Sequence, residues 1–229
     1  MVTDSWTNKL DLDTPAGVAL RQLQSALPKD RQFTITLFGS APIQVAVDRD
    51  LLSQDIDLFS DHDELKDFVV KAGLDQDQSD FYIQVCSELN FRTSQRWRTR
   101  TQSVQIENCA IILPHPIDIL IAKLNRLEEK DLEAFRVVIK KTGHPTEAEM
   151  IEELQAAVDL FRPGFDEENA VDMTGNCRRL WPEIFGREID PRAEIIAPAL
   201  EIRRKGYELD RPKRDYKREL KEELARYKA

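Results

Sequence analysis

The chain has 229 residues, of which 41% are hydrophobic and 33% are charged, and its net charge is −9. This length suits one large domain or two small ones, and the acidic balance argues against a nonspecific nucleic-acid coat. Three widely spaced cysteines, Cys86, Cys109 and Cys177, favour neither a disulfide framework nor a zinc site. No leader-like or membrane-spanning segment is visible, so we expect a cytoplasmic protein without membrane contact.

Up to Gly143 the predicted elements mix strands and helices. Thr14 and Pro15 open a helix that runs to about Leu27. Short helices are expected at residues 40–47 and from Asp61 or Asp63 to about Gly73. From Ile117 the apolar residues recur with helical spacing as far as Gly143. The apolar runs that predict strands are residues 32–38, 54–59, 81–86, with Phe91 as a candidate continuation, and 103–113.

After Gly143 the chain is predicted to be wholly helical. Thr146 and Glu149 form a capping box that opens one helix. A second is expected over about 167–185, and a third runs from Asp190 to Gly206. Residues 211–229 are mostly charged and would be a surface helix, a docking helix or a frayed tail. We therefore expect an α+β fold: a small mixed-sheet domain flanked by helices over residues 1–143, then an all-helical domain over residues 144–229.

Two acidic residues and a Gly-Ser turn are the candidate site. Asp55 and Asp57 lie two residues apart on a predicted strand, so both side chains point to the same face. Neighbouring carboxylates repel each other, and a divalent cation between them would relieve this, so we expect them to bind Mg²⁺ or Mn²⁺. Gly39 and Ser40 end the preceding strand. A glycine there lets the backbone approach phosphate, and the serine supplies a hydroxyl.

This combination is typical of nucleotidyl transfer. In that reaction a hydroxyl attacks the α-phosphorus of a nucleoside triphosphate and pyrophosphate leaves. Metal ions held by carboxylates stabilise the negative charge that spreads over the transition state, and a glycine-containing turn holds the triphosphate. An Asp-x-Asp pair or a Gly-Ser turn alone would be uninformative. Together, within a strand–turn–helix–strand order, they favour a nucleotide site.

The segments Phe38-Gly39-Ser40 and Asp55-Ile56-Asp57-Leu58 resemble the pattern of the DNA polymerase beta-like nucleotidyltransferase superfamily. The spacing resembles the abortive-infection toxin-like branch or an uncharacterised relative. A second segment, from Pro116 through Lys123-Leu124 to Lys130-Asp131, is similar to the Lys-Leu helix of that branch. The resemblance covers roughly residues 30–140.

The resemblance implies functional roles for several basic residues. Lys123 would be catalytic, and Lys130 and Asp131 would belong to the nucleotide site. Arg126 lies about one helical turn from Lys123, so both could reach phosphate. The alternative for these residues is a solvent-facing stripe on an amphipathic helix. In relatives a Trp-x-x-Arg-like stretch recurs at the position of Trp97, which suggests substrate contacts for Arg98 and Arg100. The alternative is a solvated hairpin with Trp97 anchored in the core.

The resemblance also implies partners. The substrate would be a nucleoside triphosphate. The acceptor could be a tRNA end, a protein side chain or a small molecule. The acidic charge and the charged C-terminal segment suit a partner protein such as a cognate antitoxin.

The chain departs from the superfamily pattern at one position. Active members generally carry a third carboxylate on a neighbouring strand, which acts as general base. The matching position here holds Gln84, and glutamine cannot accept a proton. Glu88 or Glu107 could take this role, and the residues do not decide between them. If neither does, the protein would be a catalytically impaired nucleotide-binding or protein-interaction module of the same fold.

Overall fold

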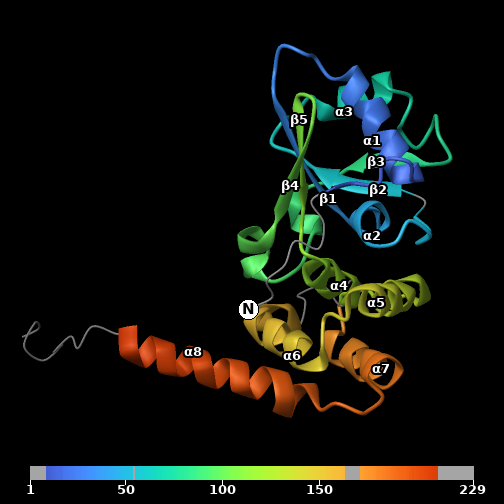
Figure 1. The fold of residues 1–229 in the computed structure, drawn as a ribbon. Coiled ribbons are helices and arrows are strands. Elements are labelled where there is room, and N and C mark those ends of the chain that lie inside the picture. The colour runs from blue at the N-terminus through green and yellow to red at the C-terminus, as the bar shows by residue number, and fades with distance from the viewer. Residues whose placement is uncertain (1–8, 54, 163–170, 211–229) are drawn as a thin grey trace, which may run out of the picture.

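The computed structural model describes residues 9–53, 55–162 and 171–210, and its centre is a five-stranded mixed sheet (Figure 1). Across the sheet the strands follow the order β3-β2-β1-β5-β4. Strand β1 pairs antiparallel with β2 and parallel with β5, whereas β3 runs parallel to β2 and β4 antiparallel to β5. The strand bounds are β1 Phe33–Phe38, β2 Asp55–Phe59, β3 Tyr82–Val85, β4 Gln102–Ile106 and β5 Cys109–Leu113.

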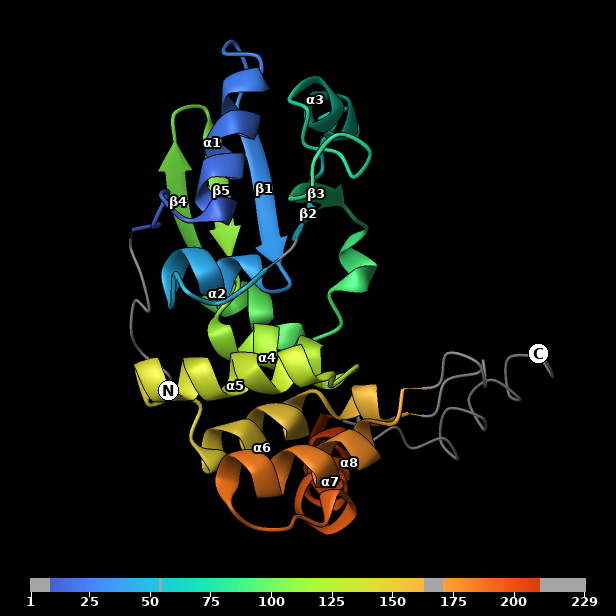
Figure 2. The same ribbon diagram turned by 90° about the vertical axis from the view of Figure 1, so that its right-hand side faces the viewer.

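One face of the sheet is covered by helices α1 (Pro15–Ala26) and α3 (Leu65–Lys71) (Figure 2). Alternate strand residues, such as Ile35, Ile56 and Ile83, point into this core because side chains on a strand alternate between faces. The short helix α2 (Ala41–Ala46) follows β1 directly. Two 3₁₀ turns, η1 (Glu88–Asn90) and η2 (Gln95–Arg100), connect β3 to β4. On each strand, the residues that alternate with these core residues lie on the opposite face of the sheet.

The remaining helices form a second layer beside the end of the sheet (Figure 1). Their shared core contains Phe135 and Trp181, both fully buried. From Ile117 onward, the buried residues of the two clusters all belong to the helical core, and so do Ile43 and Leu51 from the first part of the chain. The predicted domain boundary at Gly143 stays a prediction. The helix bounds are α4 Pro116–Leu124, α5 Glu129–Thr142, α6 Glu147–Ala156, α7 Met173–Phe185 and α8 Ala197–Asp210, with a 3₁₀ turn η3 at Val158–Phe161 and a π turn at Arg192–Ile196.

The predicted α+β class is confirmed, as is the capping box at Thr146 and Glu149. The strand predicted over 103–113 is instead a hairpin, because Glu107 adopts a positive φ of 49° and reverses the chain. The helical period after Ile117 covers two helices, which are separated where Leu127 has a φ of 48°. Neither Glu107 nor Leu127 is a glycine, the residue that usually indicates a positive φ in a sequence, so the hairpin turn and the helix break could not be predicted from these residues.

Three further element predictions are wrong. Helix α3 has Glu64 rather than an aspartate at its N-cap. Phe91 does not extend β3, because the η1 turn intervenes and the Phe91 side chain is buried against Phe38. Helix α8 continues past Gly206. The predictions for Gln54 and for residues 163–170 and 211–229 lie outside the described residues. No helix in the described ranges combines the length and the apolar character that crossing a membrane requires.

Candidate active site

The two aspartates share one face of β2, as predicted. Asp55 and Asp57 are half-buried, whereas Ile56 between them is fully buried in the core beneath the sheet. Asp57 lies opposite Phe38 on β1, the residue that precedes the Gly-Ser turn. The antiparallel pairing of β1 and β2 thus places the aspartates beside the turn, although the two segments are separated in the sequence.

Gly39 fits tightly against the Asp57 carboxylate. Its φ is 70°, and a Cβ at this position would lie 2.5 Å from Asp57 Oδ2. A side chain at Gly39 would therefore be strained by the backbone conformation and would also collide with the carboxylate. The turn therefore lies directly beside the Asp57 carboxylate.

The nearby cations compensate the negative charge of Asp55 and Asp57 only in part. Burial, followed by the neighbouring charge of Asp55, raises the pKa of Asp57 from 3.8 to about 6, although Lys123 and Arg126 act in the opposite direction. Two carboxylates on one face, with incomplete compensation, are a donor set that suits Mg²⁺ or Mn²⁺, because magnesium often takes one or two carboxylates and completes its shell with phosphate and water. Within the described ranges, no larger cluster of acidic, histidine or cysteine ligands occurs.

Lys123 connects helix α4 to the Gly-Ser turn. Its Nζ donates hydrogen bonds to Ser40 Oγ at 2.8 Å and to Asp131 Oδ1 at 3.0 Å. The side chain is only 6% exposed, and burial lowers the pKa of Lys123. The alternative of a solvent-facing stripe is therefore wrong for Lys123, which places a positive charge beside the turn.

Asp131 is the anchor of this cluster. It is fully buried and accepts hydrogen bonds from Arg126 Nε at 3.1 Å and from the Glu128 backbone N–H at 3.0 Å. Asp131 thus caps α5 and positions Lys123 and Arg126. Arg126 remains 52% exposed on the site side. Lys130 is 65% exposed and pairs with Glu128, and its contact with a nucleotide stays a prediction. It lines a hollow of about 920 Å³ between α5 and residues 48–52.

Strand β3 borders the aspartates on the other side. Tyr82 aligns with Asp55, and Gln84 aligns with Asp57, so the position expected for a third carboxylate holds an amide next to Asp57. Cys86 Sγ lies 3.9 Å from Asp57 Oδ1. Sequence reasoning missed Cys86, although the two-residue alternation from Tyr82 through Gln84 places it on the same face.

In the described part of the chain, neither substitute carboxylate forms a potential metal-binding cluster with the two aspartates. Glu88 is ion-paired to Arg98. Glu107 is in the β4–β5 hairpin next to Cys109, which aligns with Phe33 at the start of β1, whereas Asp57 aligns with Phe38 at its end. The Glu107 carboxylate accepts a hydrogen bond from Gln24 on α1. Glu107 as third carboxylate is therefore wrong, because it lies at the opposite end of the sheet.

Arg98 lies on the side of the sheet that carries the two aspartates. Its guanidinium is 5.0 Å from the centre of the Trp97 ring, and Trp97 packs edge-on against Phe59, which follows Asp57 on the same face of β2. The side chain of Arg98 is 58% exposed. A substrate contact for Arg98 stays a prediction, and its position beside an aromatic ring on this face is compatible with one.

Arg100 forms ion pairs with buried acidic side chains. It forms a two-pronged hydrogen bond with Asp118, at 2.7 and 2.6 Å, and also an ion pair with Glu153 at 2.6 Å. Its side chain is only 15% exposed. The guanidinium is therefore engaged by two carboxylates of the protein itself, and a substrate contact for Arg100 stays a prediction. Both carboxylates are distant in sequence, so no local pattern reveals them.

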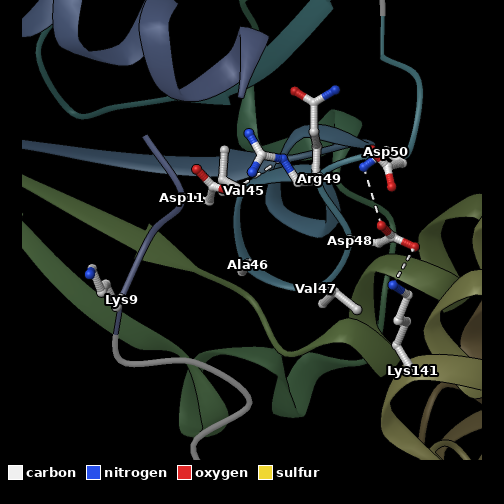
Figure 3. A pocket seen from close by; sticks show the side chains of 10 residues that line it. Lys9, Asp11, Val45, Ala46, Val47, Asp48, Arg49, Asp50 and Lys141 are labelled. Atoms are coloured by element: carbon white, nitrogen blue, oxygen red, sulfur yellow. Dashed lines mark hydrogen bonds and ion pairs between the residues drawn. The ribbon is translucent and has the colours of Figure 1, made fainter. Parts of the chain in front are cut away.

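A separate hollow of about 340 Å³ lies at the end of α2 (Figure 3). Arg49 lies 3.7 Å from Asp11, and Lys141 of α5 lies 3.3 Å from Asp48. Asp48 also accepts a hydrogen bond from the Asp50 backbone N–H. These contacts hold the segment between α2 and β2 against neighbouring elements, and this segment leads into the aspartate strand.

A family model described as "Nucleotidyltransferase of unknown function (DUF6036)" matches residues 18–174. The chain belongs to this nucleotidyltransferase family. The matched span contains the Gly-Ser turn, both aspartates and helices α4 and α5, so the DUF6036 match and the site geometry concern the same part of the molecule. Neither the curated proteins nor the solved structures include a match to this chain. The abortive-infection branch stays a prediction.

Proposed function

We propose that this protein is a metal-dependent nucleotidyltransferase that moves a nucleoside monophosphate from a nucleoside triphosphate to an acceptor. One observation carries the proposal: Asp55 and Asp57 share one face of β2 directly beside the Gly39-Ser40 turn, and Lys123 reaches the same turn. Anionic ligands for a cation and positive charge for phosphate thus meet at one point, inside a family of nucleotidyltransferases.

Each residue has a distinct task in the proposed reaction. Asp55 and Asp57 would hold Mg²⁺ or Mn²⁺, which when bound neutralises triphosphate charge and polarises the α-phosphoryl group. Gly39 permits close backbone approach of the phosphates, and the Ser40 hydroxyl can donate a hydrogen bond to them. Lys123 would stabilise charge on the departing pyrophosphate, and Arg126 offers a second cation from the exposed rim.

The resemblance to the abortive-infection branch extends this proposal to a toxin-like role, with a tRNA end, a protein side chain or a small molecule as acceptor and a cognate antitoxin as partner. Incubation with labelled nucleoside triphosphates and total cellular RNA or protein would identify the labelled acceptor.

A second candidate function is nucleotide binding without transfer. The observation that favours it is the alignment of Gln84 with Asp57, because this amide occupies the place of the usual general base. Under this alternative the protein would bind triphosphate and metal but release no pyrophosphate.

Pyrophosphate release separates the two candidates. The protein is mixed with each triphosphate, Mg²⁺ or Mn²⁺ and the cellular RNA or protein fraction. We expect release that falls at least about 100-fold in Asp57→Asn, as for loss of a metal ligand. Asp67→Asn is the matched control, because Asp67 is exposed on α3 over the covered face of the sheet. Metal-dependent triphosphate binding without release would favour the second candidate.

A further inference from the structure

The side of the site away from the Gly-Ser turn is lined by strand β3. Since β1 carries the turn and β3 is the other neighbour of β2, an acceptor that approaches opposite the triphosphate meets Tyr82, Gln84 and Cys86. These side chains are a phenol, an amide and a thiol. The acceptor side thus presents hydrogen-bond donors where a carboxylate is expected.

An alcohol acceptor needs a base to take its proton, and Gln84 cannot serve as one. The three histidines of the chain are all held elsewhere. His62 packs against Phe33 at the far end of β1, His115 caps α4, and His144 hydrogen-bonds to Glu149. Glu88 is ion-paired with Arg98, and Asp118 and Glu153 are ion-paired with Arg100.

We propose that the acceptor presents a phosphate monoester, whose attacking oxygen is already ionised, and that Gln84 selects for it. This rests on the proposed nucleotidyltransferase function. An oxygen of the acceptor phosphate forms a bond to the α-phosphorus, the bond from the α-phosphorus to the bridging β-oxygen breaks, and pyrophosphate leaves with the electron pair. No proton is transferred, because a phosphate monoester has its second pKa at about 6 and is largely a dianion at neutral pH. The product carries a new P–O–P linkage.

The Gln84 amide fits this acceptor in two ways. Its Nε2 can donate a hydrogen bond to a phosphate oxygen, and its lack of charge avoids the repulsion that a carboxylate next to Asp57 would exert on a dianion. A carboxylate would instead favour a neutral alcohol, because it could remove the proton. The identity of residue 84 therefore determines the charge of the acceptor that the site accommodates.

Matched acceptors test this inference. Labelled transfer is measured to a short RNA with a 3′-phosphate against the same RNA with a 3′-hydroxyl, and to ribose 5-phosphate against ribose. We expect the parent protein to favour the phosphate probe of a pair by at least about 10-fold, and Gln84→Glu to reverse this preference. Gln105→Glu is the control, because Gln105 is exposed on β4 at the other edge of the sheet and should leave the preference unchanged.

Equal or better transfer to the hydroxyl probes by the parent protein would overturn the inference, as would an unchanged preference in Gln84→Glu. Transfer to none of the probes also counts against it. In that case Mg²⁺-dependent binding of a nonhydrolysable triphosphate, measured by calorimetry with Asp57→Asn beside the parent, decides whether the proposed function fails too. Binding that Asp57→Asn abolishes would remove only the acceptor assignment, and no binding would remove both.

Discussion

At the scale of single residues, Asp57 combines burial with a neighbouring like charge. Burial and then Asp55 raise its pKa from 3.8 to about 6. The carboxyl group of Asp57 therefore binds its proton more tightly in the native state than in the unfolded state. The resulting stabilisation is fully present below pH 3.8 and is lost as pH rises through about 6. The ionised Asp57 carboxylate thus destabilises the metal-free protein at neutral pH.

We predict that Asp57→Asn makes the metal-free protein more stable at pH 7 by about 1–3 kcal/mol, since each pKa unit corresponds to about 1.4 kcal/mol. The gain should vanish near pH 4. Urea unfolding midpoints at pH 4, 5, 6 and 7 measure it, with Asp67→Asn as control. A constant difference between variant and parent across this range would contradict the assigned cause.

Gly39 gives a second prediction at this scale. Gly39→Ala should lower the free energy of unfolding by about 2–4 kcal/mol, because positive φ strain adds to the contact with Asp57. Gly143 is the matched control, since its φ is 75° and a Cβ there would meet nothing within 4 Å. Gly143→Ala should cost only about 1 kcal/mol. Equal losses in chemical denaturation would show that the contact with Asp57 contributes nothing.

At the scale of elements, the junction between α4 and α5 builds the positive side of the site. Asp131 caps α5 and at the same time binds Lys123 and Arg126. The helix break at Leu127 makes this arrangement available, because one uninterrupted helix would place residues 123 and 131 more than two turns apart. The local break in the helix is therefore what brings Lys123 and Asp131 together.

Asp131→Asn should destabilise the protein by about 2–4 kcal/mol, because it removes one charge from a buried pair and leaves Lys123 uncompensated. It should also weaken triphosphate binding as Lys123 loses its orientation. Glu133→Gln, an exposed carboxylate on the same helix, should change stability by no more than about 0.5 kcal/mol. Chemical denaturation and calorimetric triphosphate binding measure the two effects, and parent-like values for both in Asp131→Asn would exclude the anchoring role.

At the scale of the whole molecule, Arg100 ties the sheet layer to the helical layer. Its guanidinium joins the η2 turn to Asp118 on α4 and Glu153 on α6. Burial alone would raise the pKa of Asp118, and the bond from Arg100 acts in the opposite direction, although the pKa stays raised. This buried group of charges connects the segment between β3 and β4 to helices α4 and α6 of the helical layer.

We predict that Arg100→Met costs about 3–5 kcal/mol, because two carboxylates remain in a buried position without a cation. Arg98→Met is the control, as Arg98 is an exposed arginine of the same turn, and it should cost less than about 1 kcal/mol. Amide hydrogen exchange should accelerate most in α4 and α6. Acceleration spread evenly over the sheet and helices would argue against a tie between the layers.

The local elements of the site could be predicted from sequence because their signals are short-range. The alternation of Asp55, Ile56 and Asp57 determines that the carboxylates share a face, and the apolar run before Gly39 determines where the turn falls. The hairpin at Glu107 and the break at Leu127 could not be predicted in this way, because neither position carries the glycine that usually marks a positive φ.

By itself, then, the sequence determined the strand that carries the aspartates, the turn that lies beside them and the helix that carries Lys123. Only the tertiary structure decided that Asp131 anchors Lys123, that Arg100 binds Asp118 and Glu153, and that Glu107 lies at the far end of the sheet. The physical reason is the separation along the sequence over which each interaction acts. Strand and helix periodicity act between neighbours along the chain, whereas a charge finds its partner through the packing of separate elements, which no local pattern encodes.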